Sequence, residues 1–67
     1  MLKIGTRVKT TDERVIREYG EFGTITVVDN RDAHMPYMVK FDGDTDDDGG
    51  MWMEADLVEQ IEREVIA

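Results

Sequence analysis

The stretch "YMVKFDGDTDDDGGMWM", residues 37–53, contains two short apolar runs separated by an acidic, glycine-rich segment. Apolar side chains recur at every second position of the first run. This spacing is typical of a strand with one buried face, formed here by Tyr37, Val39 and Phe41. Aspartate and glycine favour turns between such runs. We therefore predict a strand at 36–41, a turn at 42–50 and a further strand at 51–53.

The rest of the chain also divides into short β-rich runs, which are separated by glycine, asparagine and proline. "TRVKT" (6–10) and the β-branched "TITVVDN" (24–30) predict two more strands. The segment between them, residues 11–23, is polar and ends in glycine. It predicts a long loop that can hold a helical turn at Asp12 to Arg17.

The tail, "EADLVEQIEREVIA" (54–67), supports two interpretations. "EADL" reads as a single turn that leads into a short last strand, "VEQI" (58–61). The alternative is a C-terminal helix, which would align on one face three residues spaced by four, Leu57, Ile61 and Val65. The sequence leaves both interpretations open.

Size and composition limit the classes of protein to which this chain can belong. The chain has 67 residues and no cysteine, so we expect one small domain without a disulfide or a thiolate metal site. Lys3 and Arg7 interrupt the first apolar run, and no stretch approaches the ~20 apolar residues of a membrane span. We therefore expect no signal peptide, no membrane association and a cytoplasmic location.

Two glycine-containing stretches resemble the KOW-type pattern, in which Gly-x-x-Val precedes a loop and Gly-x-x-Gly-x-Ile-x-x-Val follows it. "IGTRVKT" and "YGEFGTITVV" match this pattern at Gly5, Val8, Gly20, Gly23, Ile25 and Val28. "YMVKFDGD" and "MWMEADL" resemble the second half of small SH3-like barrels. In those barrels a Tyr-x-Val-x-Phe strand, a charged turn, a Trp strand and a short turn lead to the last strand.

The resemblance covers nearly the whole chain and implies a mainly β fold. We expect a single domain over residues 1–67, a small five-stranded SH3-like barrel at about 4–61 with a tail at 62–67. Similar barrels occur as stand-alone proteins in bacteria and their phages. They bind proline-rich peptides, methylated side chains, nucleic acids or other proteins, so the fold does not fix the function.

Charge separates two classes of partner. The net charge is −8, yet residues 1–18 hold five basic and three acidic side chains, whereas residues 42–67 hold one basic and ten acidic. An acidic chain repels phosphate backbones, which favours a protein partner with a basic surface. The alternative is a KOW-like nucleic-acid-associated module that uses the basic N-terminal third, Lys3, Arg7, Lys9, Arg14 and Arg17.

The acidic turn invites comparison with a calcium loop. An EF-hand loop needs ligands at positions 1, 3 and 5, glycine at 6 and a bidentate glutamate at 12. Counting from Asp44, the first four requirements are met by Asp44, Asp46, Asp48 and Gly49, but Ala55 occupies position 12. We therefore expect no specific metal site and no cofactor, with Asp44, Asp46 and Asp48 as weak candidates only.

The acidic turn could instead face a basic partner as a phosphate mimic, or it could be a solvated turn. The candidate partner-binding carboxylates are Asp44, Asp46, Asp47 and Asp48. Three aromatic residues are further candidates, Tyr19 and Phe22 in the long loop and Trp52 in the strand at 51–53. The alternative for these aromatic residues is packing in the core.

The methionines and the single histidine are the remaining candidates for a binding surface or a catalytic site. If the strands at 36–41 and 51–53 pair, we expect Met38, Met51 and Met53 to cluster on the face opposite Tyr37 and Trp52. Such a cluster is either an adaptable protein contact or part of the core. His34 is the only histidine, and the chain has no serine or cysteine. Because a small barrel offers no deep cleft, we expect no enzyme.

Overall fold

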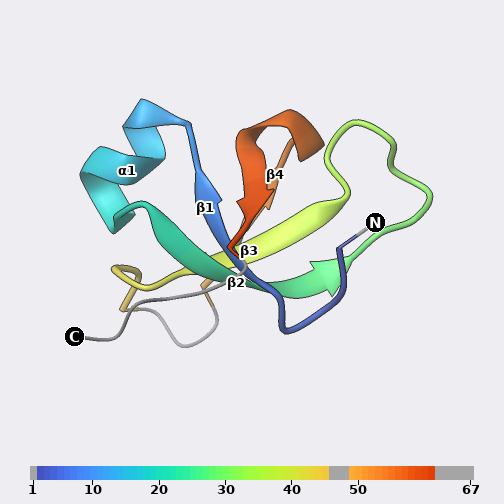
Figure 1. The fold of residues 1–67 in the computed structure, drawn as a ribbon, viewed down its shortest axis with the longest axis horizontal. Coiled ribbons are helices and arrows are strands. Elements are labelled where there is room, and N and C mark those ends of the chain that lie inside the picture. The colour runs from blue at the N-terminus through green and yellow to red at the C-terminus, as the bar shows by residue number, and fades with distance from the viewer. Residues whose placement is uncertain (1, 46–48, 62–67) are drawn as a thin grey trace.

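Five antiparallel strands form one sheet that curls into a half-barrel (Figure 1). The computed structural model describes residues 2–45 and 49–61. Within these ranges the elements are β1 (Arg7–Thr10), α1 (Glu13–Tyr19), β2 (Phe22–Val28), β3 (Tyr37–Phe41), β4 (Met51–Met53), the 3₁₀ turn η1 (Ala55–Leu57) and β5 (Val58–Gln60). The sheet order β4-β3-β2-β1-β5 is compatible with a small SH3-like barrel, and the predicted fold class is confirmed.

The inner face of the curled sheet carries the hydrophobic core. The alternation in "YMVKF" places every second side chain of β3 on this face, as predicted. The buried apolar residues are Val8, Val15, Ile25, Tyr37, Val39, Phe41 and Met53. Burial of one large aliphatic or aromatic side chain contributes about 1.5–3 kcal/mol. These few residues are therefore the main source of stability in a chain without disulfides.

The strand β2 changes register midway along β3. Ile25 lies opposite Val39, but Val27 lies opposite Met38, so Thr26 is an extra residue on β2. An extra residue of this kind bends its strand and increases the local twist. The bend helps β2 to pair with both β1 and β3 within one curled sheet.

The helix α1 occupies residues for which the sequence predicted a loop with at most a helical turn. The Asp12 side chain accepts a hydrogen bond from the backbone N–H of Arg14 (3.0 Å) and so caps the first turn. Val15 is 5% exposed and anchors the helix in the core. The helix ends at Gly20, whose φ of 93° is strained for other residues.

The loop prediction is thus wrong at residues 13–19. The reason is that one buried residue in a seven-residue helix gives no recognisable periodicity. The strand that follows begins at Phe22 and ends at Val28, not at 24 and 30, so Phe22 lies in β2 and not in a loop. The other strands match their predicted positions to within a residue.

The two interpretations of the tail are resolved up to residue 61. Ala55–Leu57 form a 3₁₀ turn that leads into β5, so the turn-and-strand interpretation is confirmed and a helix over this part is wrong. Val65, the last residue of the proposed helical stripe, lies outside the described residues. Pairing with β1 decides the outcome, because Val58 lies opposite Thr10 and Gln60 opposite Val8.

The predicted methionine cluster is wrong. β3 and β4 do pair, but Met38 lies directly opposite Trp52, while Tyr37 lies opposite Met53. Residues directly opposite each other share a face of the sheet. Met38 and Trp52 are therefore on the outer face, and Met51 and Met53 are on the inner face, where Met53 is buried. The sequence alone could not give the register of this pair.

Neither helical segment within residues 2–45 and 49–61 is long and apolar enough to cross a membrane.

Replacing Val15 tests whether α1 is part of the core. Val15→Ala removes buried methyl groups and should lower the free energy of unfolding by about 1–2 kcal/mol, measured by urea denaturation. Arg17→Ala, at an exposed position of the same helix, is the control and should change it by less than about 0.5 kcal/mol. Equal effects of the two substitutions would show that α1 is not packed against the sheet.

Candidate functional site

The segment between α1 and β2 lies against the turn that follows β3. The backbone N–H of Gly43 donates to the carbonyl of Tyr19, and that of Asp42 donates to the carbonyl of Phe22, both at 2.9 Å. In Figure 1 the yellow turn after β3 lies beside the end of α1. Two of the candidate aromatic residues, Tyr19 and Phe22, are thus held next to the start of the acidic turn.

Gly43 makes this close approach possible. A Cβ atom at position 43 would collide with the backbone carbonyl of Tyr19 and would lie 3.1 Å from its Cα atom. The obstacle is backbone, which cannot rotate away as a side chain can. A residue without a Cβ is therefore needed here.

The two segments joined by this contact carry four carboxylates. We call this region the acidic end, formed by Glu18, Glu21, Asp42 and Asp44 with Tyr19 and Phe22. The region also holds a cation, because Lys40 Nζ donates a hydrogen bond to the backbone carbonyl of Asp44 at 2.6 Å. The pKa of the Tyr19 hydroxyl is raised, first by the charge of the adjacent Glu18, then by a hydrogen bond with Glu18 and by partial burial, with a smaller effect of Asp44. The predicted contact residues Asp46, Asp47 and Asp48 lie outside the described residues.

One of these carboxylates is held by an arginine from β1. Arg7 Nη1 donates to Asp42 Oδ1 at 2.8 Å, and Arg7 Nη2 donates to Asp42 Oδ2 at 2.6 Å. Arg7 Nη1 also donates to Thr24 Oγ1 on β2 (2.8 Å). The hydrogen bonds from Arg7 lower the pKa of the Asp42 carboxyl, and the positive charge of Lys40 adds to the effect. This two-point bridge ties the turn after β3 to β1.

Apolar side chains remain exposed on the outer face of the sheet. Val27 on β2 lies opposite Met38 on β3, which lies opposite Trp52 on β4. Val27 is 40% exposed and Trp52 is 39% exposed. We call these three residues the outer apolar row. The sequence prediction missed it because it depends on the register of three strands and on the extra residue in β2.

The structure separates the three candidate aromatic residues. Tyr19 is half-buried, and Phe22 is 42% exposed at the start of β2, so both belong to the acidic end. Trp52 is on the edge strand β4, within the outer apolar row. Along the outer face, Thr24 and Lys40 lie between Phe22 and this row. The acidic end and the outer apolar row are therefore two distinct surfaces.

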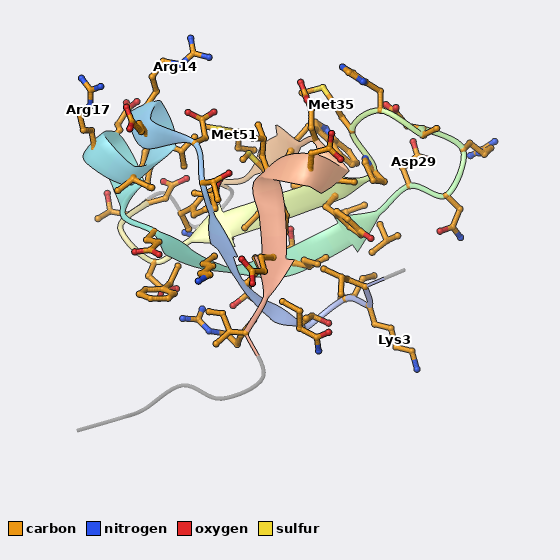
Figure 2. The ribbon with its side chains drawn as sticks, turned by 45° about the horizontal axis from the view of Figure 1, so that its top comes forward. Lys3, Arg14, Arg17, Asp29, Met35 and Met51 are labelled. Atoms are coloured by element: carbon orange, nitrogen blue, oxygen red, sulfur yellow. The ribbon has the colours of Figure 1, made fainter. Side chains whose placement is uncertain are left out.

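The basic side chains of the N-terminal third do not form one patch. Arg14 and Arg17 extend from α1, whereas Lys3 lies at the opposite end of the molecule (Figure 2). Four of the five candidates lie within 4.0 Å of a carboxylate, in the pairs Arg7–Asp42, Lys9–Glu59, Arg14–Asp12 and Arg17–Glu13. Internal pairing leaves less positive charge to attract phosphate.

His34 and the acidic residues show no arrangement for a metal. Among residues 2–45 and 49–61, no group of three or more His, Asp or Glu side chains could hold one. Of the weak candidates, only Asp44 is described. His34 is exposed, with its Nε2 3.6 Å from Glu54 Oε1. Asp32 accepts hydrogen bonds from the backbone N–H groups of Met35 and His34, which lower the pKa of its carboxyl.

Comparison with protein-family models, with curated proteins and with solved structures finds no match for this chain. The resemblance to SH3-like and KOW-type proteins therefore stays a prediction from the residues quoted above.

The bridge between Arg7 and Asp42 should make stability depend on pH. A carboxyl whose folded-state pKa is lowered stabilises the native state fully above its unfolded pKa of about 3.9, and this contribution is lost as pH falls through the folded-state pKa. Because Arg7 and Asp42 are 31% and 56% exposed, screening limits the contribution to about 0.5–1 kcal/mol. Asp42→Asn should cost this amount at neutral pH and almost nothing at strongly acidic pH, measured by urea denaturation.

The matched control for this experiment is Glu59→Gln. Glu59 and Lys9 are both exposed, with 3.8 Å between their charged atoms, so little change is expected at any pH. A cost of Asp42→Asn that stays constant from neutral to acidic pH would contradict the role of its charge.

Substitution of Gly43 tests the contact between the end of α1 and the turn after β3. Gly43→Ala should lower the free energy of unfolding by about 1–3 kcal/mol, because the backbone must shift to admit the Cβ atom. For a chain of this size, each kcal/mol corresponds to a fall of about 4–8 °C in the thermal midpoint. Thr45→Ala, exposed in the same turn, is the control. An unchanged thermal midpoint in Gly43→Ala would mean that the end of α1 and the turn after β3 are not in contact.

Proposed function

We propose that this chain is a non-catalytic protein-binding module that engages a basic partner through the acidic end. The observation that supports the proposal is that Glu18, Glu21 and Asp44 lie on the two segments joined at Tyr19 and Phe22, while the fourth carboxylate, Asp42, is paired with Arg7. The backbone of these segments is held by the hydrogen bonds between Gly43 and Tyr19 and between Asp42 and Phe22. Aromatic rings beside carboxylates suit a partner rich in lysine and arginine, since the rings also attract cations.

Rigidity adds to the case for this surface. A pre-formed contact surface loses less conformational entropy on binding than a flexible one. The acidic end is held on one side by α1 and on the other by the bridge from Arg7, so the backbone that carries its side chains is fixed. The resemblance to stand-alone bacterial or phage barrels and the absence of cysteine support a cytoplasmic setting as part of the same proposal.

The second candidate function is nucleic-acid association through Lys3, Arg7, Lys9, Arg14 and Arg17. The distribution of these side chains supports it less well. Arg7 is engaged by Asp42 at two points, and Lys3 lies far from Arg14 and Arg17 (Figure 2). A duplex would meet separate cations and not a continuous basic stripe, with a net charge of −8 repelling it.

Retention on two resins distinguishes these functions. The protein should be retained on an immobilised basic protein, be released as salt rises, and pass through immobilised duplex DNA. Glu18→Gln combined with Glu21→Gln should release at clearly lower salt, because two charges of the acidic end are removed. The control has the same charge change away from this region, Glu13→Gln combined with Asp56→Asn. Retention on DNA, or equal loss in the two double variants, would contradict the proposal.

A further inference from the structure

The two edges of the sheet differ in their chemistry. The order β4-β3-β2-β1-β5 leaves one edge to β5 and the other to β4. β5 has the sequence "VEQ", and its Glu59 is charged and pairs with Lys9. Natural proteins place charged side chains on edge strands to discourage the addition of a further strand. β4 is "MWM", with no charge and no proline. β4 is therefore the edge that lacks these protective features.

The outer side of β4 offers backbone groups for pairing. β4 pairs with β3 through three residues, and no backbone hydrogen bond in the described part of the chain reaches β4 from an element other than β3. An unpaired strand edge is a template for an incoming extended segment, which gains main-chain hydrogen bonds and places alternate side chains on the two faces.

The faces of β4 show what such a segment would contact. On the outer face it would cover Trp52, the exposed end of the outer apolar row. On the inner side it would meet a groove of about 240 Å³ between β4 and α1. The groove is lined by the apolar residues Val15 and Met51, by the carboxylate-bearing residues Asp12 and Glu18, and by Arg14, which is paired with Asp12. Figure 2 shows Met51 in the space beside α1.

The charges around β4 indicate which kind of segment would pair with it. Glu54 follows β4 directly, and Glu18 lines the groove beside Met51, at the other end of the strand. Lysine or arginine side chains would find carboxylates at both ends of this edge, while their aliphatic stems would cover Met51 and Trp52. A second copy of the chain, with a net charge of −8, would bring like charges together at the same places.

We infer that β4 is a strand-addition site for an extended segment of a partner protein in which basic and apolar residues alternate, with Trp52 as the anchor. The inference rests on the proposed function, since it specifies how a basic partner would be held. It adds to the acidic end the outer apolar row and the backbone edge of β4, next to which Glu18 of the acidic end lies, and it gives a definite backbone conformation for the bound segment.

Trp52 is the only tryptophan, so its fluorescence reports directly on this edge. The probe is a short peptide of alternating lysine and valine. It should bind saturably, shift the emission of Trp52 to the blue as the ring is covered, and slow hydrogen exchange at the amides of β4. The same peptide N-methylated at alternate backbone nitrogens keeps its charge but loses donors along one edge, and should bind about tenfold more weakly or worse.

Matched comparisons separate this inference from the proposed function. A lysine–proline peptide of equal charge cannot form a strand and should bind weakly. If it binds as well as the lysine–valine peptide, the attraction to a basic partner stands and strand addition is wrong. If neither peptide binds, both proposals fail. Equal binding of a glutamate–valine peptide, or slowed exchange at β5 in place of β4, would also overturn the inference.

Substitutions in the protein test whether Trp52 anchors the bound segment. Trp52→Ala, followed by calorimetry, should weaken binding of the lysine–valine peptide about tenfold, whereas Ile4→Ala, an exposed apolar residue away from β4, should leave it unchanged. If Trp52→Ala does not fold, Trp52→Thr keeps a residue favoured in strands at this position but removes the ring, and it is expected to weaken binding in the same direction. Equal affinity of a folded row variant and Ile4→Ala would exclude the outer apolar row as the anchor.

Discussion

The close contact between Gly43 and the carbonyl of Tyr19 is the constraint on which the acidic end depends. It joins the end of α1 to the turn after β3, two segments that the sheet alone would leave independent. Through this contact the carboxylates on either side of Tyr19 become one surface. The bridge from Arg7 to Asp42 adds a second tie from β1 to the same turn. Local geometry therefore brings together residues that are distant in sequence.

Ion pairs explain why the basic side chains of the N-terminal third present so little continuous positive charge. Four of the five basic side chains of the N-terminal third are each paired with a carboxylate, from the turn after β3, from β5, or from α1 and its N-cap. Exposed pairs of this kind add little to stability. Their effect is on recognition, because they divide the positive charge into separate, partly neutralised positions, whereas the acidic end keeps the charges of Glu18, Glu21 and Asp44 beside the bridge from Arg7 to Asp42.

Much of the fold could be predicted from the sequence, because alternation in "YMVKF" and the β-branched run before it reflect which face is buried. The helix α1 could not, since its single buried residue, Val15, leaves no periodic signal. The positions of Met38 and Trp52 could not either, because they follow from strand register and from the extra residue at Thr26. Tyr19 and Phe22 were predicted as contact residues, but the glycine contact that unites them with Asp44 is visible only in three dimensions.

The central claim is that a basic partner meets the acidic end. Amide chemical shifts of the isotope-labelled chain, recorded while an unlabelled basic protein is added, test it most directly. The largest shifts should occur at residues 18–22 and 42–45, with smaller changes along α1. Shifts concentrated at Lys3, Arg14 and Arg17, or spread evenly over the surface, would contradict it.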